Sequence, residues 1–264
     1  MWNEVAELYG EGISPFGFFS TELVRVAGLS PGDSVLDLGT GNGLGLVPAA
    51  RAVAPAVVVG VDFATQMLEV AGQRAARFAV QNVELVCMDV AHLDLGDATF
   101  DVALASSVFQ FVGYSTDVLR EWRRVLRPGG RLVFSVPEIG SDPAMSMIGD
   151  LIGEHAAQLA PEVLATSRVA QQNRSEHPDL AALCLAGGFE RAATSQLRLR
   201  TTVADADEWW AMQWTHGIRA FLREFDEATL EQIKRDAGIR LEGLRRPDGA
   251  IPLTLTMTVC HAVK

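Results

Sequence analysis

Short apolar runs alternate with longer amphipathic stretches between residues 34 and 136. Each apolar run is rich in Val, Leu and Ala and ends at a polar or glycine residue, which predicts a buried strand. The predicted strands are residues 34–38, 56–61, 83–87, 100–105 and 131–136, and the helices between them are residues 44–53, 65–78 and 116–126. Strands separated by helices of this length predict βαβ units and a parallel sheet covered on both faces.

The pattern is looser from residue 141 onward, where helical stretches outnumber strands. Helices are predicted over residues 144–159, 161–172 and 178–186, a strand over 189–199, and a mostly helical block over 205–243. Asp205 and Glu208 form a capping box that predicts one helix over 208–224. Residues 253–262 alternate apolar and polar, which is typical of an antiparallel strand. The chain therefore predicts an α/β fold: a seven-stranded, mostly parallel sheet with helices on both faces and an antiparallel last strand.

The stretch after the first predicted strand is the most informative one. Residues 35–45 read V-L-D-L-G-T-G-N-G-L-G, a buried strand that runs into a glycine-rich turn and then a helix. Glycine lets a ligand lie against the main chain, and the helix start presents free N–H groups there, which indicates a nucleotide-like ligand. The dinucleotide fingerprint G-x-G-x-x-G does not fit, because Leu44 stands at the sixth position from Gly39. The alternative is a tight turn that binds nothing.

Acidic residues follow the next two strands. Asp62 comes directly after the second strand, where a carboxylate can accept hydrogen bonds from both hydroxyls of a ribose. Asp89 follows the third strand, where a carboxylate and backbone groups can read the edge of an adenine. Helix or turn capping is the alternative role for each acid. Because ligands bind beyond the carboxyl ends of parallel strands, we expect these acids to lie near the glycine turn.

Several stretches resemble, in order, the motifs of the class I S-adenosylmethionine (SAM) methyltransferases. They are V-L-D-L-G-T-G-N-G at 35–43 (motif I), G-V-D at 60–62 with M-L at 67–68 (post-I), C-M-D-V at 87–90, F-D-V-A at 100–103, and L-R-P-G-G-R-L at 126–132. The last is similar to an element of small-molecule methyltransferases. The resemblance covers about residues 30–140. It implies a Rossmann-like fold, SAM as the cofactor, and methyl transfer by in-line displacement to an O, N or C nucleophile of a small organic acceptor.

The resemblance also implies roles for individual residues. The glycine turn with Asp37 would hold the methionine part of SAM, Asp62 the ribose, and Asp89 with Val90 the adenine. An aromatic N-terminal segment, residues 1–30, is expected to cover the cofactor. The predicted cofactor-binding residues are Asp37, Gly39, Thr40, Gly41, Asn42, Gly43, Asp62, Phe63, Met67, Asp89, Val90, Ala91, Ser106, Tyr9 and Phe16.

Residues 141–250 are expected to form a helical lid that binds the acceptor. The predicted acceptor-binding residues are Phe19, Gln110, Tyr114, Trp209, Trp210 and Trp214. Packing of the tryptophans against the sheet is the alternative. His216 and His155 are the candidates for a catalytic general base, although an aligned nucleophile of low pKa can react without one.

Composition narrows the class of protein. A chain of 264 residues with 48% hydrophobic residues suits one domain. Within it, the resemblance implies that residues 31–140 bind SAM, and we expect residues 141–250 to surround the sixth strand and 251–264 to form the last strand. The formal net charge of −11 argues against a nucleic-acid partner. We expect no membrane span and no signal peptide, and the histidines lack the spacing of metal ligands. The sequence leaves open whether the protein forms a homodimer. Cys87, Cys184 and Cys260 are expected to be buried free thiols, which favours the cytoplasm.

Three other functions stay open. A protein with the same SAM site can catalyse a cyclisation instead of methyl transfer, or can act as a regulatory subunit. A NAD-dependent oxidoreductase is the third, and Leu44 in the glycine turn disfavours it.

Overall fold

The computed structural model describes residues 3, 6, 15–138, 140, 142–159, 178–215 and 217–264. Its strands are β1 (Val35–Leu38), β2 (Val58–Asp62), β3 (Val83–Cys87), β4 (Phe100–Ser106), β5 (Leu126–Glu138), β6 (Arg191–Val203) and β7 (Ile251–Val263). Its α-helices are α2 (Pro15–Val26), α3 (Leu46–Val53), α4 (Thr65–Arg77), α5 (Thr116–Val125), α6 (Pro143–Glu154), α8 (Leu180–Ala186), α9 (Ala206–Gln213), α10 (Arg219–Leu222) and α11 (Glu227–Glu242). Two 3-10 turns, η1 (Phe109–Val112) and η2 (Ala156–Gln158), follow β4 and α6.

The strands form one sheet in the order β3-β2-β1-β4-β5-β7-β6. Strands β1 to β5 pair in parallel, and β7 is antiparallel to both β5 and β6. This confirms the predicted seven-stranded, mostly parallel sheet with an antiparallel last strand. The chain runs from β1 outward to β2 and β3 and then returns to β4 on the other side of β1. The switch point at which open α/β sheets bind ligands therefore lies between β1 and β4.

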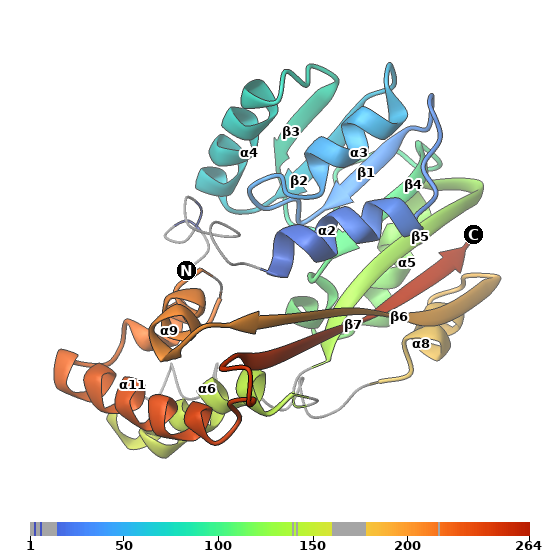
Figure 1. Cartoon of the computed structure of the whole chain (residues 1–264). Helices are drawn as coiled ribbons and strands as arrows, with labels where there is room; N and C mark the ends of the chain where they lie inside the picture. The colour runs from blue at the N-terminus through green and yellow to red at the C-terminus, as the bar shows by residue number, and fades with distance from the viewer. Residues whose placement is uncertain are drawn as a thin grey trace.

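Helices cover both faces of the sheet (Figure 1). On one face α2, α3 and α4 bury the apolar side chains of β1 and β2. On the other face α5 and α8 close a core centred on three aromatic rings, all fully buried. The ring centroid of Phe109 lies 5.5 Å from that of Trp122 and 5.2 Å from that of Phe134. Because Phe109 belongs to η1, this aromatic packing fixes the turn that follows β4.

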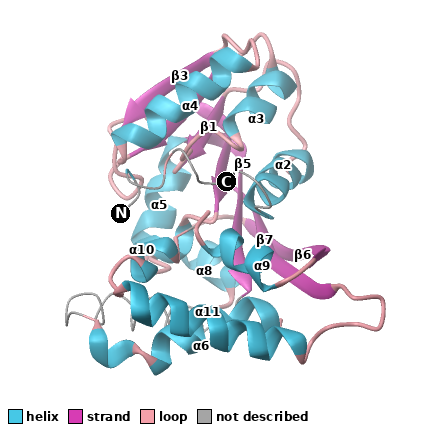
Figure 2. Cartoon of the chain, turned by 60° about the vertical axis from the view of Figure 1, so that its left-hand side comes forward, coloured by secondary structure: helices cyan, strands magenta, loops and turns pink. Residues whose placement is uncertain are grey.

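A second core lies beyond the end of β5. The β6–β7 pairing continues past Glu138 to the pair Val203 and Ile251, and there the two strands meet α6, α9, α10 and α11 (Figures 1 and 2). We call these four helices the helical layer. Trp209 of α9 is completely buried in it and donates a hydrogen bond from Nε1 to the carbonyl of Ala144 in α6, at 2.9 Å. The helical layer is thus a separately packed unit carried by the ends of two long strands.

Several predicted boundaries were wrong, each for a physical reason. The helix predicted over 208–224 is broken into α9 and α10, because Trp214 ends α9 and the hydroxyl of Thr215 donates to the carbonyl of Met212 (2.8 Å). Strand β5 begins at Leu126 rather than at residue 131, since Leu126 pairs with Phe100 across a bulge. The helix predicted over 161–172 lies outside the described residues.

The cysteines divide into two environments. Cys184 and Cys260 are buried free thiols, as predicted, with their Sγ atoms 3.7 Å apart. Cys87 is exposed, which contradicts the prediction of three buried thiols. The reason is the position of β3 at the edge of the sheet, where its last residue has a neighbour on one side only.

No helix among the described residues is long and apolar enough to cross a bilayer.

The capping residue of α6 provides a test of how the helical layer is attached. Asp142 is 8% exposed; its Oδ1 accepts from the amides of Ala144 and Met145, and its Oδ2 accepts from the amide of Thr254 in β7 at 2.7 Å. Asp142→Ala removes a cap and orphans a strand amide, so we expect urea denaturation to show a loss of about 2–4 kcal/mol.

Asp179 is the matched control, since its carboxylate caps α8 through the amide of Ala182 and bonds no strand amide among the described residues. Asp179→Ala is expected to cost about 1 kcal/mol. Equal losses in the two variants would contradict a special role for the bond to β7.

Candidate cofactor and acceptor site

The glycine turn between β1 and α3 lies at the switch point and is packed on both flanks. A Cβ added to Gly39, whose φ is +63°, would lie 2.6 Å from Cγ2 of Val108 in the turn after β4. A Cβ on Gly43 would lie 3.2 Å from the Cα of Ala71 in α4. Both positions require glycine because neighbouring chain segments approach so closely.

The centre of the same turn is open. Gly41 has φ +54°, and a Cβ there would meet no heavy atom of the described residues within 4 Å. Its amide donates to Oδ2 of Asp62 at 2.9 Å, which ties the turn to the end of β2. The turn therefore has closed flanks and an open middle, and this shape fits a ligand that lies along the main chain.

Asp37 at the end of β1 is a carboxyl group held out of water. It is 4% exposed, and its Oδ2 accepts a hydrogen bond from the hydroxyl of Thr40 at 2.7 Å. Burial raises the pKa of Asp37 from 3.8 to about 7, with the Thr40 bond opposing the rise and the charge of Asp62 adding to it. A buried carboxylate of this kind favours a cationic partner, such as an ammonium group.

Asp62 at the end of β2 is the second buried carboxyl group. Its Oδ1 accepts from the amide of Ala64 at 2.9 Å, and its Oδ2 accepts from Gly41. Burial raises the pKa of Asp62, although these amide bonds oppose the rise. Each carboxylate oxygen can accept a further hydrogen bond, so two adjacent hydroxyls, as on a ribose, match the acceptors that are left.

Part of the N-terminal segment lies against this site. The amide of Gln66, at the start of α4, donates to Oδ1 of Asn3, and Nδ2 of Asn42 donates to the carbonyl of Ala6 at 3.2 Å. Ala6 packs on Ala64 and Met67, and Met67 is 2% exposed. The side chain of Asn42 thus holds Ala6 beside the glycine turn. Phe63 is 62% exposed at the same edge.

The residues predicted to contact adenine lie in the segment after β3. Oδ1 of Asp89 accepts from the amide of Ala91 (2.9 Å), and its side chain is largely exposed. Val90 is buried, and its carbonyl accepts from Nε1 of Trp122 at 2.8 Å. The amide of Met88 donates to the carbonyl of Asp62, so this segment and the end of β2 are directly joined.

The turn after β4 forms the other side of the site. Ser106 pairs with Ser135 of β5, and the hydroxyls of Ser106 and Ser20 lie 3.1 Å apart. Ser107 and Tyr114 have φ values of +57° and +53°, a strained conformation for residues other than glycine. Nε2 of Gln110 donates to the carbonyl of Ser107 at 2.9 Å. Burial raises the pKa of Tyr114, which keeps its hydroxyl protonated.

The residues predicted for the acceptor are divided between the core and the helical layer. Phe19 and Trp209 are almost fully buried, Trp210 and Trp214 are half-buried, and the rings of the last two are perpendicular with centroids 6.1 Å apart. His155 ends α6, where its ring contacts that of Phe225. Phe16 lies half-buried on α2. Tyr9 and His216 lie outside the described residues.

Sequence reasoning missed Ser20. Its contact with Ser106 joins residues 86 positions apart, which no local pattern reports. One signal was present: Ser20 follows Phe16 by one helical turn, so both share a helix face.

In the described ranges, no three His, Cys, Asp or Glu side chains gather as metal ligands.

Comparison with known proteins connects this geometry to a family. Residues 36–134 match the family described as "Methyltransferase domain". Nocamycin O-methyltransferase from Saccharothrix syringae is 30% identical over 241 residues, which cover 84% of this chain and 82% of that protein. Three other curated relatives match 41–47% of this chain, and this chain spans 31%, 45% and 28% of their lengths.

Solved structures share the fold. Haemonchus contortus phosphoethanolamine N-methyltransferase 2 in complex with SAM aligns with a TM-score of 0.61 and 18% identity, covering 99% of this chain and 56% of that one. The YcgJ protein of Bacillus subtilis aligns with a TM-score of 0.59 and 18% identity, covering 93% and 97%. At these identities the likeness concerns the fold alone.

The buried carboxyl of Asp37 predicts a pH-dependent stability. Because its pKa is raised in the folded protein, stability falls as pH rises from 3.8 to about 7 and stays low above that. Asp37→Asn keeps an acceptor for Thr40 and removes the buried charge. We expect it to raise the free energy of unfolding of the ligand-free protein at pH 8 by about 2–4 kcal/mol, with a smaller gain at pH 5.

Asp101→Asn is the control, because we expect it to change the free energy of unfolding in the opposite direction. Burial alone would raise the pKa of Asp101, but bonds from the Ser34 amide and the Arg127 guanidinium lower it. Asp101→Asn should therefore reduce stability at pH 8. Denaturant titrations at several pH values measure the free energy of unfolding of both variants. An Asp37→Asn protein less stable than the parent at pH 8 would contradict the raised pKa assigned to Asp37.

Proposed function

Because this chain belongs to the SAM-dependent methyltransferases, we propose that it transfers a methyl group from SAM to a small organic acceptor. The observation that carries the proposal is the pair of buried carboxyl groups that contact the glycine turn, Asp37 through Thr40 and Asp62 through Gly41. A cationic amino acid joined to a ribose is the ligand whose chemistry this arrangement matches.

Each part of SAM has residues suited to hold it. Asp37 would accept from the ammonium of the methionine part, whose positive charge offsets the cost of ionising a buried carboxyl group. The free acceptors of Asp62 would receive the two ribose hydroxyls. Asp89, Val90 and Ala91 would face the adenine, and Phe63 offers an exposed ring beside the ribose.

When bound, SAM supplies a methyl group already activated by the positive charge of its sulfur. The protein then needs to align the acceptor with that group and to exclude water, both of which contribute to rate. Gln110 and Tyr114, in the turn after β4, and Trp210 and Trp214, in and after α9, are the residues that we propose for the acceptor. The helical layer would act as the acceptor lid.

Proton removal from the acceptor is a separate question. His155 and His216 stay the candidates for a general base. The relative from Saccharothrix syringae is named as an O-methyltransferase, so oxygen acceptors are the first to test. The net charge of −11 favours a small molecule over a nucleic acid. Two adjacent buried thiols support the cytoplasm as the compartment.

Calorimetry with SAM, S-adenosylhomocysteine and NAD tests the cofactor. We expect the first two to bind and NAD not to bind. Asp62→Ala should weaken S-adenosylhomocysteine binding at least about tenfold, because two hydrogen bonds to a buried charged group are lost. Glu190→Ala, at an exposed position just before β6, is the control and should leave the affinity unchanged. Binding of NAD without binding of SAM would overturn the proposal.

Turnover is tested separately with SAM labelled on its methyl group. Phenols, carboxylic acids and amines are offered in turn, and label in the extracted product reports transfer. A product that forms without release of S-adenosylhomocysteine would instead support a cyclisation on the same SAM site.

A further inference from the structure

The segment that carries the predicted adenine contacts is long and irregular. It runs from Met88 to Thr99 between β3 and β4, and we call it the β3–β4 loop. Val90 and Leu93 are its well-buried apolar residues, whereas Asp89, His92, Asp94 and the stretch 96–99 are exposed. Met88, Ala91 and Leu95 also pack, partly buried, against the main core. Apolar contacts therefore hold one side of the loop, and its exposed residues need other contacts to keep one conformation.

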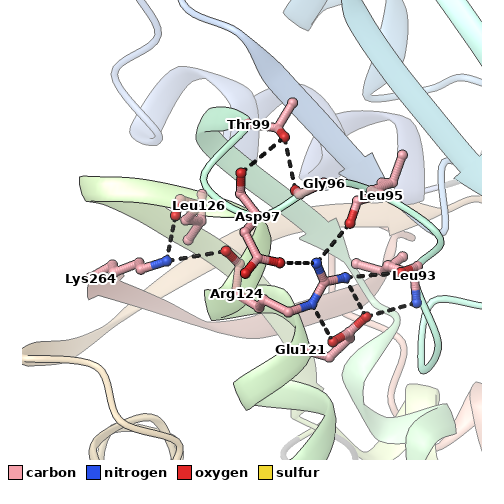
Figure 3. A network of polar contacts seen from close by, with 9 residues as sticks. All are labelled: Leu93, Leu95, Gly96, Asp97, Thr99, Glu121, Arg124, Leu126 and Lys264. Carbon is pink, nitrogen blue, oxygen red and sulfur yellow. Dashed lines mark hydrogen bonds and ion pairs between the residues drawn. The ribbon is translucent and has the colours of Figure 1, made fainter.

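Polar side chains of α5 hold the other side of the loop (Figure 3). Arg124 uses all five of its N–H donors. Nη1 donates to the carbonyl of Leu95 (2.7 Å) and to Oδ1 of Asp97 (2.6 Å), and Nη2 donates to the carbonyl of Leu93 (2.9 Å). The remaining donors, on Nε and Nη2, go to the two carboxylate oxygens of Glu121 at 2.8 and 2.7 Å.

Glu121 closes the arrangement from the other side. Its Oε1 also accepts from the amide of Leu93 at 3.0 Å, so the pair holds both backbone groups of that residue. One residue on, Trp122 holds the carbonyl of Val90. Three side chains of a single helix thus fix the loop at Val90, Leu93, Leu95 and Asp97. Val90 and Leu93 flank Ala91, which in turn bonds Asp89.

We propose that Arg124 and Glu121 are positioning residues that hold the β3–β4 loop in the conformation that reads the adenine of SAM. The inference rests on the proposed function, since it assigns the nucleobase end of the same site. Neither residue touches the cofactor in this account. They act through the backbone of Leu93 and through Ala91 and Asp89.

Charge and exposure indicate that this pair serves geometry more than overall stability. The side chains of Arg124 and Glu121 are 31% and 23% exposed, so their Coulomb attraction is partly screened by water. The bond from Arg124 lowers the pKa of Glu121, which keeps both groups charged throughout the neutral range. A bidentate guanidinium–carboxylate pair is stiff, and its remaining N–H groups point in fixed directions toward the loop carbonyls.

The test compares two ligands that differ only in the nucleobase, S-adenosylhomocysteine and S-inosylhomocysteine. The parent protein should prefer the adenine ligand. Arg124→Met should weaken S-adenosylhomocysteine about tenfold and S-inosylhomocysteine much less, because only the adenine-reading contacts are lost. Arg124→Lys keeps the charge but not the fork and should give an intermediate preference.

Arg120→Met is the matched control, because Arg120 lies on the same helix and, among the described residues, pairs only with the exposed Asp117. It should leave both affinities unchanged. If Arg124→Met does not fold, Glu121→Gln carries the test, as it keeps the shape and one acceptor oxygen while removing the charge.

The outcomes are distinct. A parallel weakening of both ligands, or a lower melting temperature with an unchanged preference, would mean a merely structural role and overturn the inference. A parent that binds both ligands equally would also overturn it while leaving the proposed function intact. Only a parent that binds neither ligand would count against the proposed function itself.

Discussion

Two carboxyl groups are buried at the carboxyl ends of adjacent strands, and this constraint shapes much of the candidate site. Asp37 and Asp62 end the neighbouring strands β1 and β2, and both have pKa values raised by burial. Burial of such groups costs stability unless hydrogen bonds or an opposite charge offset it. The Thr40 hydroxyl and the amides of Gly41 and Ala64 offset part of that cost. A cationic ligand would offset the rest.

The surrounding elements keep this edge of the sheet in shape. Gly39 touches Val108, so the turns after β1 and β4 are packed against each other. The rings of Phe109, Trp122 and Phe134 then hold the β4 turn on the sheet, and Trp122 extends the same support to Val90. The segments that follow β3 and β4 are therefore braced by one aromatic core.

The helical layer is stabilised by packing of its own. It does not share the main core but packs around its own apolar centre at the ends of β6 and β7. Its attachment depends on a few directed bonds, such as that from Thr254 to Asp142. The packing of the helical layer is therefore separate from the packing behind the glycine turn.

The sheet and the identity of the acids at its edge were predictable from the chain, because both depend on local pattern. Asp62 was found by its place directly after an apolar run, and the parallel pairing of the first five strands was indicated by the helices between them. Contacts between distant segments were not predictable, and Ser20 with Ser106 and Arg124 with Leu93 are examples. The exposure of Cys87 and the end of α9 at Trp214 were wrongly predicted for a related reason. Exposure at a sheet edge and the competition of side chains for backbone carbonyls both depend on the assembled fold.

A crystal structure of the protein with S-adenosylhomocysteine tests the central claim most directly. The account predicts both ribose hydroxyls within hydrogen-bond distance of Asp62, the ammonium at Asp37, and the ligand chain passing over the open face of Gly41. A ligand bound with its ribose away from Asp62, or with Asp37 facing no cationic group, would contradict it.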